Sequence, residues 1–383
     1  MKPKYQIMSK KTSSSRKVKE SRGLNSNNLI IRADANIQIG TGHVMRCLAL
    51  AQAWQDAGGK VTFVMAMKPP AIEDRLRSED IGVVYVDEIP GSTGDAIQTV
   101  VMAEQHDAQW IVVDGYHFDG AYQKEIKKSE KRLLFVDDYG HTDHYCADIL
   151  LNQNLHAHDG LYGNREPDTK LLLGTRFVLL RREFLRWQGW EREVPPMARQ
   201  ILVTFGGSDE QNVTYKAVRA LKQADLNGTD VSVIVGSANP DLEVIRNELM
   251  SSPFKSQLLN SVNDMATLMA SADIAISASG STCWELAYMG LPSLVLPLTD
   301  NQVPIANELG RRGIVVNLGG CGNISVPQIT KITKELISSS NERTIMSKRG
   351  STLIDGDGAA RIVMYMQCGN SQSPSQISQE CSR

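Results

Sequence analysis

Short apolar runs alternate with longer amphipathic or charged stretches through the first half of the chain. Runs of this kind predict buried strands near residues 29–31, 61–65, 83–86, 110–113, 133–136 and 149–151. The stretches between them predict helices near 43–57, 73–78, 95–105 and 124–131. Alternation of short buried strands with helices is typical of a parallel sheet covered on both faces.

The same rhythm returns after Pro195-Pro196, which is the best candidate linker. Strands are predicted near 201–204, 231–235, 274–277, 293–296 and 314–316. Helices are predicted near 212–222, 265–270, 283–289, 301–311, 326–338 and 359–367. We therefore predict an α/β protein with two doubly wound, Rossmann-like domains and an interdomain cleft. The predicted boundaries are a disordered basic arm at 1–28, domains at 29–190 and 191–367, and a disordered tail at 368–383. The last helix is a candidate to pack back on the first domain.

The first strand leads into a loop with the pattern Gly40-Thr41-Gly42-His43 and then into a helix. The glycines allow a sharp turn and close approach to a ligand. The loop does not fit a dinucleotide fingerprint, because Met45 stands where a third glycine is expected. His43 lies at the carboxyl edge of the predicted sheet, where open α/β folds bind ligands. It is either a general base that takes a proton from water or a histidine that only caps or packs.

Three further strands of the first half end in polar residues. Asp114 and Tyr116 follow one strand, Asp138 follows the next, and Asn152 follows a third. Since the carboxyl ends of parallel strands line one crevice, these side chains are expected to face the same space as His43. The alternative for each is a loop residue that caps or forms a turn.

Two glycine-bearing loops of the second half are candidate phosphate sites. One contains Gly206, Gly207 and Ser208, and the better one is Ser279-Gly280-Ser281-Thr282, directly before a predicted helix. Small residues, hydroxyls and a helix N-terminus favour an oxyanion, although an N-cap with nothing bound is the simpler alternative.

Polar groups near the second loop could hold the rest of a nucleotide. The Glu285 carboxylate could accept from two ribose hydroxyls or only favour the helix start. Asn301 and Gln302, after the next strand, could reach a sugar or phosphate at the cleft.

Composition excludes several other classes of protein. Lys plus Arg is 41 and Asp plus Glu is 43, for a formal charge of −2, and aromatic residues are 6%. These values argue against nucleic acid as a partner. Eight Lys or Arg lie in residues 1–28, without the apolar run of a signal peptide. No segment reads as a membrane span.

Cysteine and histidine spacing give no sign of a metal site. The six cysteines form no Cys-x-x-Cys pair, so reduced thiols and a cytoplasmic location are expected. His141 and His144, with Cys146 nearby, lack a usual zinc spacing, and no metal is predicted.

Taken in order, these motifs resemble the UDP-2,4-diacetamido-2,4,6-trideoxy-β-L-altropyranose hydrolases of the pseudaminic acid pathway. The resemblance covers roughly residues 29–365. The matching segments are Arg32-Ala33-Asp34, Gly40-Thr41-Gly42-His43-Val44-Met45-Arg46-Cys47, Val113-Asp114-Gly115-Tyr116, Asp137-Asp138, Asn152-Gln153-Asn154, Gly206-Gly207-Ser208-Asp209, Ser279-Gly280-Ser281-Thr282-Cys283-Trp284-Glu285 and Asn301-Gln302. One departure is that the family often has His where Gly115 stands, whereas His117 follows the tyrosine here.

The resemblance implies a GT-B-like fold with a sugar-binding, catalytic first domain and a UDP-binding second domain. It implies that His43 activates water, that Tyr116 lies near the sugar, and that Arg32, Asp34, Gly40, Gly42, Asp114, Asp138 and Asn152 surround the substrate. It further implies that Gly206, Gly207, Ser208, Gly236, Ser279, Gly280, Ser281, Thr282, Glu285, Asn301 and Gln302 hold UDP. No cofactor or metal is implied.

The implied function is hydrolysis of a UDP-2,4-diacetamido-2,4,6-trideoxyhexose to UDP and free sugar, with inversion at C1. Its setting would be nonulosonic acid biosynthesis for surface polysaccharide or flagellin glycosylation. The alternatives are a UDP-sugar glycosyltransferase of the same fold and a non-catalytic UDP-sugar sensor. The sequence leaves the oligomeric state unknown.

Overall fold

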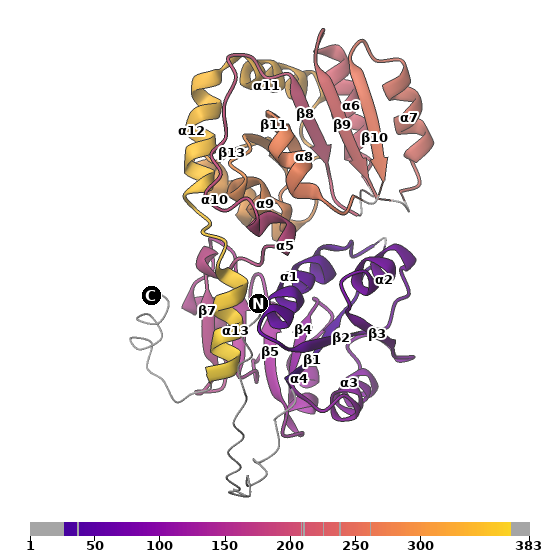
Figure 1. The fold of residues 1–383 in the computed structure, drawn as a ribbon, viewed down its shortest axis with the longest axis vertical. Coiled ribbons are helices and arrows are strands. Elements are labelled where there is room, and N and C mark those ends of the chain that lie inside the picture. Colours follow the sequence, from indigo (N-terminus) through magenta and orange to yellow (C-terminus); the bar gives the residue numbers. More distant parts are fainter. Residues whose placement is uncertain are drawn as a thin grey trace, which may run out of the picture.

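The computed structural model describes residues 27–368, apart from 37, 208, 210, 225, 237–238 and 261. The predicted basic arm up to residue 26, and the predicted tail beyond Cys368, lie outside the described residues. Figure 1 shows two α/β bodies, one above the other, with the first half of the chain in the lower body.

The first half forms a seven-stranded parallel sheet with the order β3-β2-β1-β4-β5-β6-β7. Its strands are β1 (Asn28–Ala33), β2 (Lys60–Met65), β3 (Gly82–Tyr85), β4 (Ala108–Asp114), β5 (Arg132–Val136), β6 (Ile149–Asn152) and β7 (Lys170–Leu173). Its helices are α1 (Gly42–Asp56), α2 (Pro70–Arg77), α3 (Thr93–Gln105) and α4 (Gly120–Lys127). Neighbouring β1 residues point to opposite faces, since Ile31 packs with the α1 side and Ile30 with the α3 and α4 side.

The second half forms a six-stranded parallel sheet with the order β10-β9-β8-β11-β12-β13. Its strands are β8 (Gln200–Thr204), β9 (Asp230–Val235), β10 (Lys255–Asn260), β11 (Ile274–Ala278), β12 (Ser293–Leu296) and β13 (Val315–Asn317). Its helices are α6 (Val213–Gln223), α7 (Leu242–Met250), α8 (Met265–Ser271), α9 (Thr282–Tyr288), α10 (Val303–Arg311), α11 (Val326–Ser338) and α12 (Ser340–Ser351). The predicted pair of doubly wound parallel sheets is confirmed.

Two segments connect the halves. Between β7 and β8 the chain forms the short helix α5 (Arg182–Leu185), which contacts both α1 and α8. After α12 the chain returns to the lower body, where α13 (Gly358–Cys368) lies beside α1 (Figure 1). The indole of Trp110 donates to the Met366 carbonyl at 3.1 Å, which fixes α13 on the first sheet.

Some predicted elements differ from the observed ones. The predicted helix at 124–131 begins earlier, at Gly120, because the Asp119 carboxylate caps it by accepting from the Tyr122 amide at 2.9 Å. The edge strand β10 was not predicted, since its alternating exposed residues lack a continuous apolar run. Helices α7 and α12 were also not predicted. In α12, Glu342, Arg343, Lys348 and Arg349 interrupt the apolar stripe.

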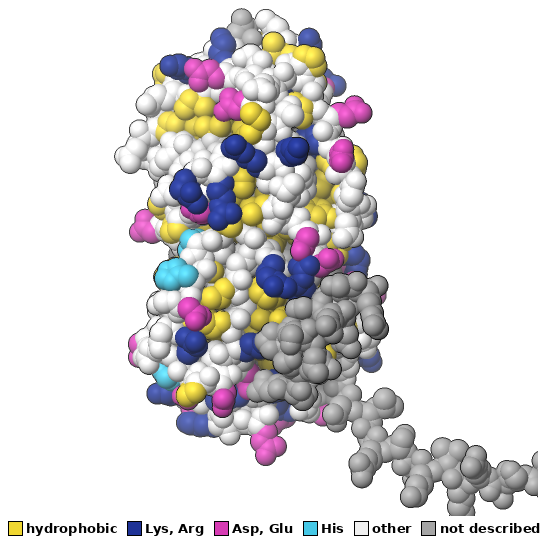
Figure 2. All heavy atoms as spheres, turned by 90° about the vertical axis from the view of Figure 1, so that its left-hand side faces the viewer, with side chains coloured by type: hydrophobic (Ala, Val, Ile, Leu, Met, Phe, Trp, Pro, Cys, Tyr) yellow, Lys and Arg dark blue, Asp and Glu magenta, His cyan; other side chains and the backbone are white. Residues whose placement is uncertain are grey.

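The surface carries both signs of charge. Figure 2 shows Lys and Arg side chains interspersed with Asp and Glu side chains on the face that lies to the left in Figure 1. Among the described residues, no helix is long and apolar enough to cross a membrane.

Candidate active site

The loop after β1 is held by its own polar groups before it enters α1. The Ile39 amide donates to the Asn36 side chain at 2.7 Å, and the Gly40 amide donates to the Asn36 carbonyl at 2.9 Å. Gly40 has φ 73°, a conformation that favours glycine. Helix α1 then begins at Gly42, so His43 lies in its first turn.

His43, in the first turn of α1, and Asp114, at the end of β4, form a buried pair. His43 Nδ1 lies 2.7 Å from Asp114 Oδ1, and the imidazole side chain keeps 10% exposure. A carboxylate only accepts, so the proton between them belongs to Nδ1, and the neutral ring carries its lone pair on Nε2. Within the described residues, Nε2 has no hydrogen-bond partner. The pair therefore has the arrangement of an oriented general base.

Arg46, one turn after His43, ties this pair to the next strand end. Its guanidinium donates to both oxygens of Asp114 at 2.6 Å and to both oxygens of Asp138 at 2.8 and 2.9 Å. Burial opposes ionisation of Asp114, but the charge of Arg46 and the hydrogen bonds from Arg46 and His43 outweigh it and hold the Asp114 pKa well below its usual range. Asp114 is thus a fixed negative charge behind the imidazole.

Tyr116 covers the open side of the pair. Its ring meets the His43 ring edge to face at a centroid distance of 4.7 Å, and its hydroxyl donates to Asp138 at 2.6 Å. Burial and the negative charge of Asp138 raise the Tyr116 pKa, so the phenol stays protonated at neutral pH. Asp138 is also held by the Asn154 amide, which donates at 2.7 Å.

Loops from the second half contact this cluster. The Asn301 amide, after β12, donates to the Tyr116 hydroxyl at 2.8 Å. A Cβ added to Gly42 would lie 3.8 Å from Ser281 Oγ, and one added to Gly207 would lie 2.7 Å from Thr41 Cγ2. The carboxyl ends of the two sheets therefore face each other with His43 at their contact.

The first glycine-bearing loop of the second half brings two strand ends together. Gly206 has φ 84°, and a Cβ added to Gly236 would lie 2.9 Å from the Gly207 carbonyl oxygen. The loops after β8 and β9 therefore touch through backbone atoms. Ser208, the remaining predicted residue of this loop, lies outside the described residues.

The second loop leads into α9, which begins at Thr282. Ser279 is fully buried, and its hydroxyl donates to the Gln302 carbonyl at 3.2 Å, so this hydroxyl braces the loop. The amides of 280–282 have no protein acceptor within the described residues. They are the donors an oxyanion would use here.

Glu285 is paired with the connection between the halves. Its Oε1 accepts from Arg181 Nη2 at 2.9 Å. Burial is the main influence and raises the Glu285 pKa, although Arg181 opposes the shift. The second carboxylate oxygen has no partner within the described residues.

Arg32 and Asp34 are buried inside the first half. Arg32 donates to both oxygens of Asp95 at 2.8 and 2.9 Å and to Asp34 at 2.6 Å. Asp34 also accepts from the Ala66 amide at 2.7 Å. The polar groups of both residues are hydrogen-bonded within the protein. This geometry favours a role in holding the strand ends together rather than in contacting a substrate.

Asn152 is likewise a buried brace. Its amide donates to the Asp138 carbonyl at 3.0 Å and to the Tyr162 hydroxyl at 2.7 Å, and it has no exposed surface. Of the polar strand ends, the structure brings Asp114, Tyr116 and Asp138 together with His43 and places Asn152 behind them.

Sequence reasoning missed the linking roles of Arg46, Asn154 and Arg181. A signal existed for Arg46, because residues three apart in a helix lie on the same face, and Arg46 is three residues after His43.

His117 explains why glycine can stand at position 115, where the family often has histidine. A Cβ at position 115 would lie 2.9 Å from Cε1 of the His117 ring, so that ring fills the space a residue-115 side chain would take.

One group of side chains among the described residues could hold a metal ion. The ligand atoms of His144, Cys146 and Glu166 lie within 4.8 Å of one another. His144 Nε2 is already 3.0 Å from a Glu166 oxygen, and Nδ1 is 3.0 Å from Asn164. These bonds satisfy the imidazole without an ion, and the group contains none of the residues around His43.

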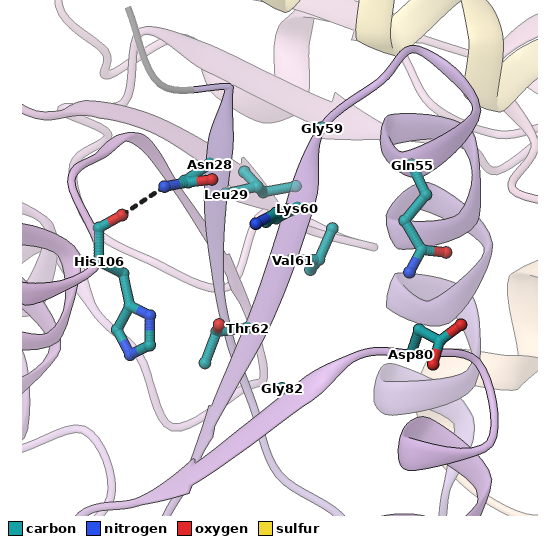
Figure 3. A pocket seen from close by; sticks show the side chains of 10 residues that line it. All are labelled: Asn28, Leu29, Gln55, Gly59, Lys60, Val61, Thr62, Asp80, Gly82 and His106. Atoms are coloured by element: carbon teal, nitrogen blue, oxygen red, sulfur yellow. Dashed lines mark hydrogen bonds between the residues drawn. The ribbon is translucent and has the colours of Figure 1, made fainter.

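A cavity of about 420 Å³ lies at the opposite edge of the first sheet. Figure 3 shows Asn28, Lys60 and Gly82, from the amino ends of β1, β2 and β3, around it, with Asn28 donating to the His106 carbonyl. Because ligands of doubly wound folds bind at carboxyl ends, we assign the chemistry to the His43 edge rather than to this cavity.

Comparisons with known proteins agree with this architecture. Residues 201–319 match the profile of the Glycosyltransferase family 28 C-terminal domain. The chain is 27% identical over 346 residues to the Spore coat polysaccharide biosynthesis protein SpsG of Bacillus subtilis strain 168, covering 88% of this chain and 97% of that protein. It is 24% identical over 295 residues to the UDP-2,4-diacetamido-2,4,6-trideoxy-beta-L-altropyranose hydrolase of Campylobacter jejuni, covering 75% of this chain and 98% of that protein.

Among solved structures, MurG of Acinetobacter baumannii superposes with a TM-score of 0.61 at 17% identity, covering 89% of this chain and 99% of that one. The GT-B-like fold class is thereby confirmed. The relatives together support an enzyme that acts on nucleotide sugars, and they leave hydrolysis and transfer as the two reactions to be separated.

Proposed function

We propose that the protein hydrolyses a UDP-2,4-diacetamido-2,4,6-trideoxyhexose to UDP and the free sugar. The observation that carries this proposal is the His43–Asp114 pair, with Nδ1 bound to a carboxylate at 2.7 Å and Nε2 without a partner among the residues that the structure describes. Such a pair suits the removal of a proton from water.

In the proposed reaction, His43 Nε2 takes a proton as the water oxygen forms a bond to C1 of the sugar. The bond between C1 and the β-phosphate oxygen breaks, and its electron pair leaves with UDP. Attack opposite the leaving group inverts C1. The imidazolium that forms is stabilised by Asp114, which stays ionised, and the proton then passes to solvent.

The second half would bind UDP. The amides of 280–282 would donate to the diphosphate, and the free oxygen of Glu285 would accept from a ribose hydroxyl. Backbone groups at Gly236 would face uracil, while Asn301 and Gln302 would reach the phosphate or sugar. Offsetting the charge on UDP improves it as a leaving group, so no separate acid is required.

The first half would hold the sugar. The loop containing Gly40 and Gly42 leaves room for it beside His43, and Tyr116 would line the same space. This division of labour is supported by the match of residues 201–319 to a glycosyltransferase domain profile and by the likeness to a hydrolase over 75% of the chain.

A UDP-sugar glycosyltransferase is the second candidate. The observation that favours it is the same family 28 profile, whose description names transferases. Both reactions use a base near C1, and they differ only in whether water or a sugar hydroxyl is the nucleophile. The two are separated by whether UDP is released when no acceptor other than water is present.

The test is a UDP-release assay on purified protein with water as sole acceptor. We expect wild-type turnover, and a fall of roughly 10² to 10⁴-fold in kcat for His43→Gln. The dissociation constant for UDP should be unchanged in that variant, which serves as the control for folding. UDP release that appears only after a sugar acceptor is added would instead establish the transferase.

A further inference from the structure

Tyr139 is an exposed aromatic residue beside the candidate active site. It follows Asp138 in the loop after β5, and 40% of its surface is exposed. Its hydroxyl has no hydrogen-bond partner within the described residues. The part of this ring that stays exposed, with no polar partner for its hydroxyl, leaves an apolar surface that the folded protein itself does not use.

The loop that carries Tyr139 is nevertheless held rigidly. Asp137 has no exposed surface, and its Oδ1 accepts from the Tyr139 amide at 2.7 Å and the Gly140 amide at 2.6 Å. Its Oδ2 accepts from the Tyr145 hydroxyl at 2.8 Å. Burial opposes ionisation of Asp137, but the neighbouring His141, together with the bonds from Gly140 and Tyr145, lowers the Asp137 pKa to about 2. The backbone of Tyr139 is therefore fixed even though its ring is exposed.

The ring of Tyr139 belongs to a row of aromatic rings that ends at the candidate base. Tyr139 lies 5.3 Å from Tyr116 between centroids, tilted by 54°, and Tyr116 lies 4.7 Å from His43. Tyr139 is thus one ring away from the imidazole. The His141 ring, at 5.7 Å, supports Tyr139 from within the same loop.

We propose that Tyr139 is a sugar-binding platform that contacts the apolar parts of the substrate sugar next to His43. This inference rests on the proposed function and adds a residue that sets specificity within that site. The chemistry follows from the ring, because a flat apolar face packs against C–H groups and methyl groups and not against charged phosphates. The sugar class it favours carries acetamido methyls and a methyl at C6 rather than hydroxyl groups at these positions.

The test is equilibrium binding in a His43→Gln background, which prevents turnover. Dissociation constants are measured for UDP, for UDP-2,4-diacetamido-2,4,6-trideoxyhexose and for UDP-N-acetylglucosamine. The quantity of interest is the ratio of the constant for UDP to that for each UDP-sugar, since this ratio isolates the contribution of the sugar. Tyr139→Ala is compared with Tyr139→Phe, which keeps the ring and removes only the unpartnered hydroxyl.

We expect Tyr139→Ala to lower the ratio for the trideoxy sugar about tenfold, a typical size for one lost aromatic contact. The ratio for UDP-N-acetylglucosamine should change less, the affinity for UDP should not change, and Tyr139→Phe should behave as the parent. An unchanged ratio in Tyr139→Ala would overturn the inference while leaving the proposed function intact. Failure of the parent protein to bind UDP would overturn the proposed function and this inference with it.

Discussion

His43 Nδ1 lies 2.7 Å from the Asp114 carboxylate, which joins the first turn of α1 to the end of β4 across 71 residues of sequence. The same carboxylate accepts from Arg46 through both oxygens. One buried anion therefore fixes both the tautomer of the imidazole and the position of the helix that carries it.

Replacing Asp114 with Asn should disable His43 as a base while keeping a side chain of the same size in the site. The Asn amide can accept from Nδ1 or donate to it, so the imidazole loses its fixed tautomer and the stabilising charge. We expect kcat to fall by roughly 10² to 10⁴-fold. Retention of at least a tenth of wild-type kcat in a folded Asp114→Asn protein would show that His43 does not need this carboxylate.

Arg32 offers a test of whether a buried charged residue touches substrate. It is fully buried between Asp34 and Asp95, so Arg32→Ala leaves two buried carboxylates without their cation. We expect a loss of about 3–5 kcal/mol in the free energy of unfolding, measured by chemical denaturation. A variant of normal stability with a raised KM would place Arg32 in the substrate site instead.

The contact between the two halves can be tested at Gly207. An added Cβ there would meet Thr41 side-chain atoms at 2.7 and 2.9 Å, which pushes the two loops apart. We expect Gly207→Ala to lower kcat/KM roughly ten- to a hundredfold, because small misplacements at a reacting centre are costly. The double variant Gly207→Ala with Thr41→Gly should recover most of this loss.

Gly236 provides the matched control for that rescue. Its added Cβ would meet the Gly207 carbonyl oxygen at 2.9 Å and Cα at 3.3 Å, which are backbone atoms. Gly236→Ala should therefore lower activity and should not be rescued by Thr41→Gly. Equal rescue of both variants would mean that Thr41 does not act through contact with Gly207.

His141 and Asp137 predict a dependence of stability on pH. His141 Nδ1 lies 2.6 Å from Asp137, and Nε2 lies 3.0 Å from the Phe118 carbonyl. Burial opposes protonation, but Asp137 outweighs it and raises the His141 pKa. Stability from a raised histidine pKa is fully present below about 6.5 and is lost as pH rises through the folded-state pKa.

Thermal unfolding midpoints of the wild type should therefore fall between pH 6 and pH 8, and His141→Gln should lack this part of the slope. The exposed His158→Gln serves as the matched control and should keep it. Measurements stop at pH 8 because the buried Cys47 thiol, whose pKa is raised by burial, adds a slope of the same sign above it. If the unfolding midpoint of His141→Gln fell with pH as steeply as that of the wild type, the His141–Asp137 pair would not contribute to the pH dependence of stability.

The sequence was informative where burial was continuous. Strands such as β4, with Ile111, Val112 and Val113 fully buried, form apolar runs that stand out in any chain. The strand β10 and the helix α12 have no such run, because one lies at a sheet edge and the other carries charges around its circumference. Their presence depends on the neighbouring elements and not on a local pattern.

The candidate site was likewise predictable in part. The expectation that the strands run parallel was enough to predict that His43 and Asp114 share one edge of the sheet. Sequence reasoning did not predict that the guanidinium of Arg46 would donate to both Asp114 and Asp138, or that Asn301 would reach Tyr116 from the other half. The helical spacing of Arg46 from His43 indicates a shared face. The reach of Arg46 to Asp138 and the approach of Asn301 from the other half depend on packing between elements that are distant in the sequence.

The central claim is that water attacks C1 of a UDP-sugar, and isotope labelling tests it most directly. The protein is incubated with UDP-2,4-diacetamido-2,4,6-trideoxyhexose in ¹⁸O-labelled water without any acceptor, and the products are read at early times by mass spectrometry and NMR. The account predicts free sugar that carries ¹⁸O at C1 with inverted configuration, and unlabelled UDP. Label in the UDP phosphate, or no release of UDP at all, would contradict it.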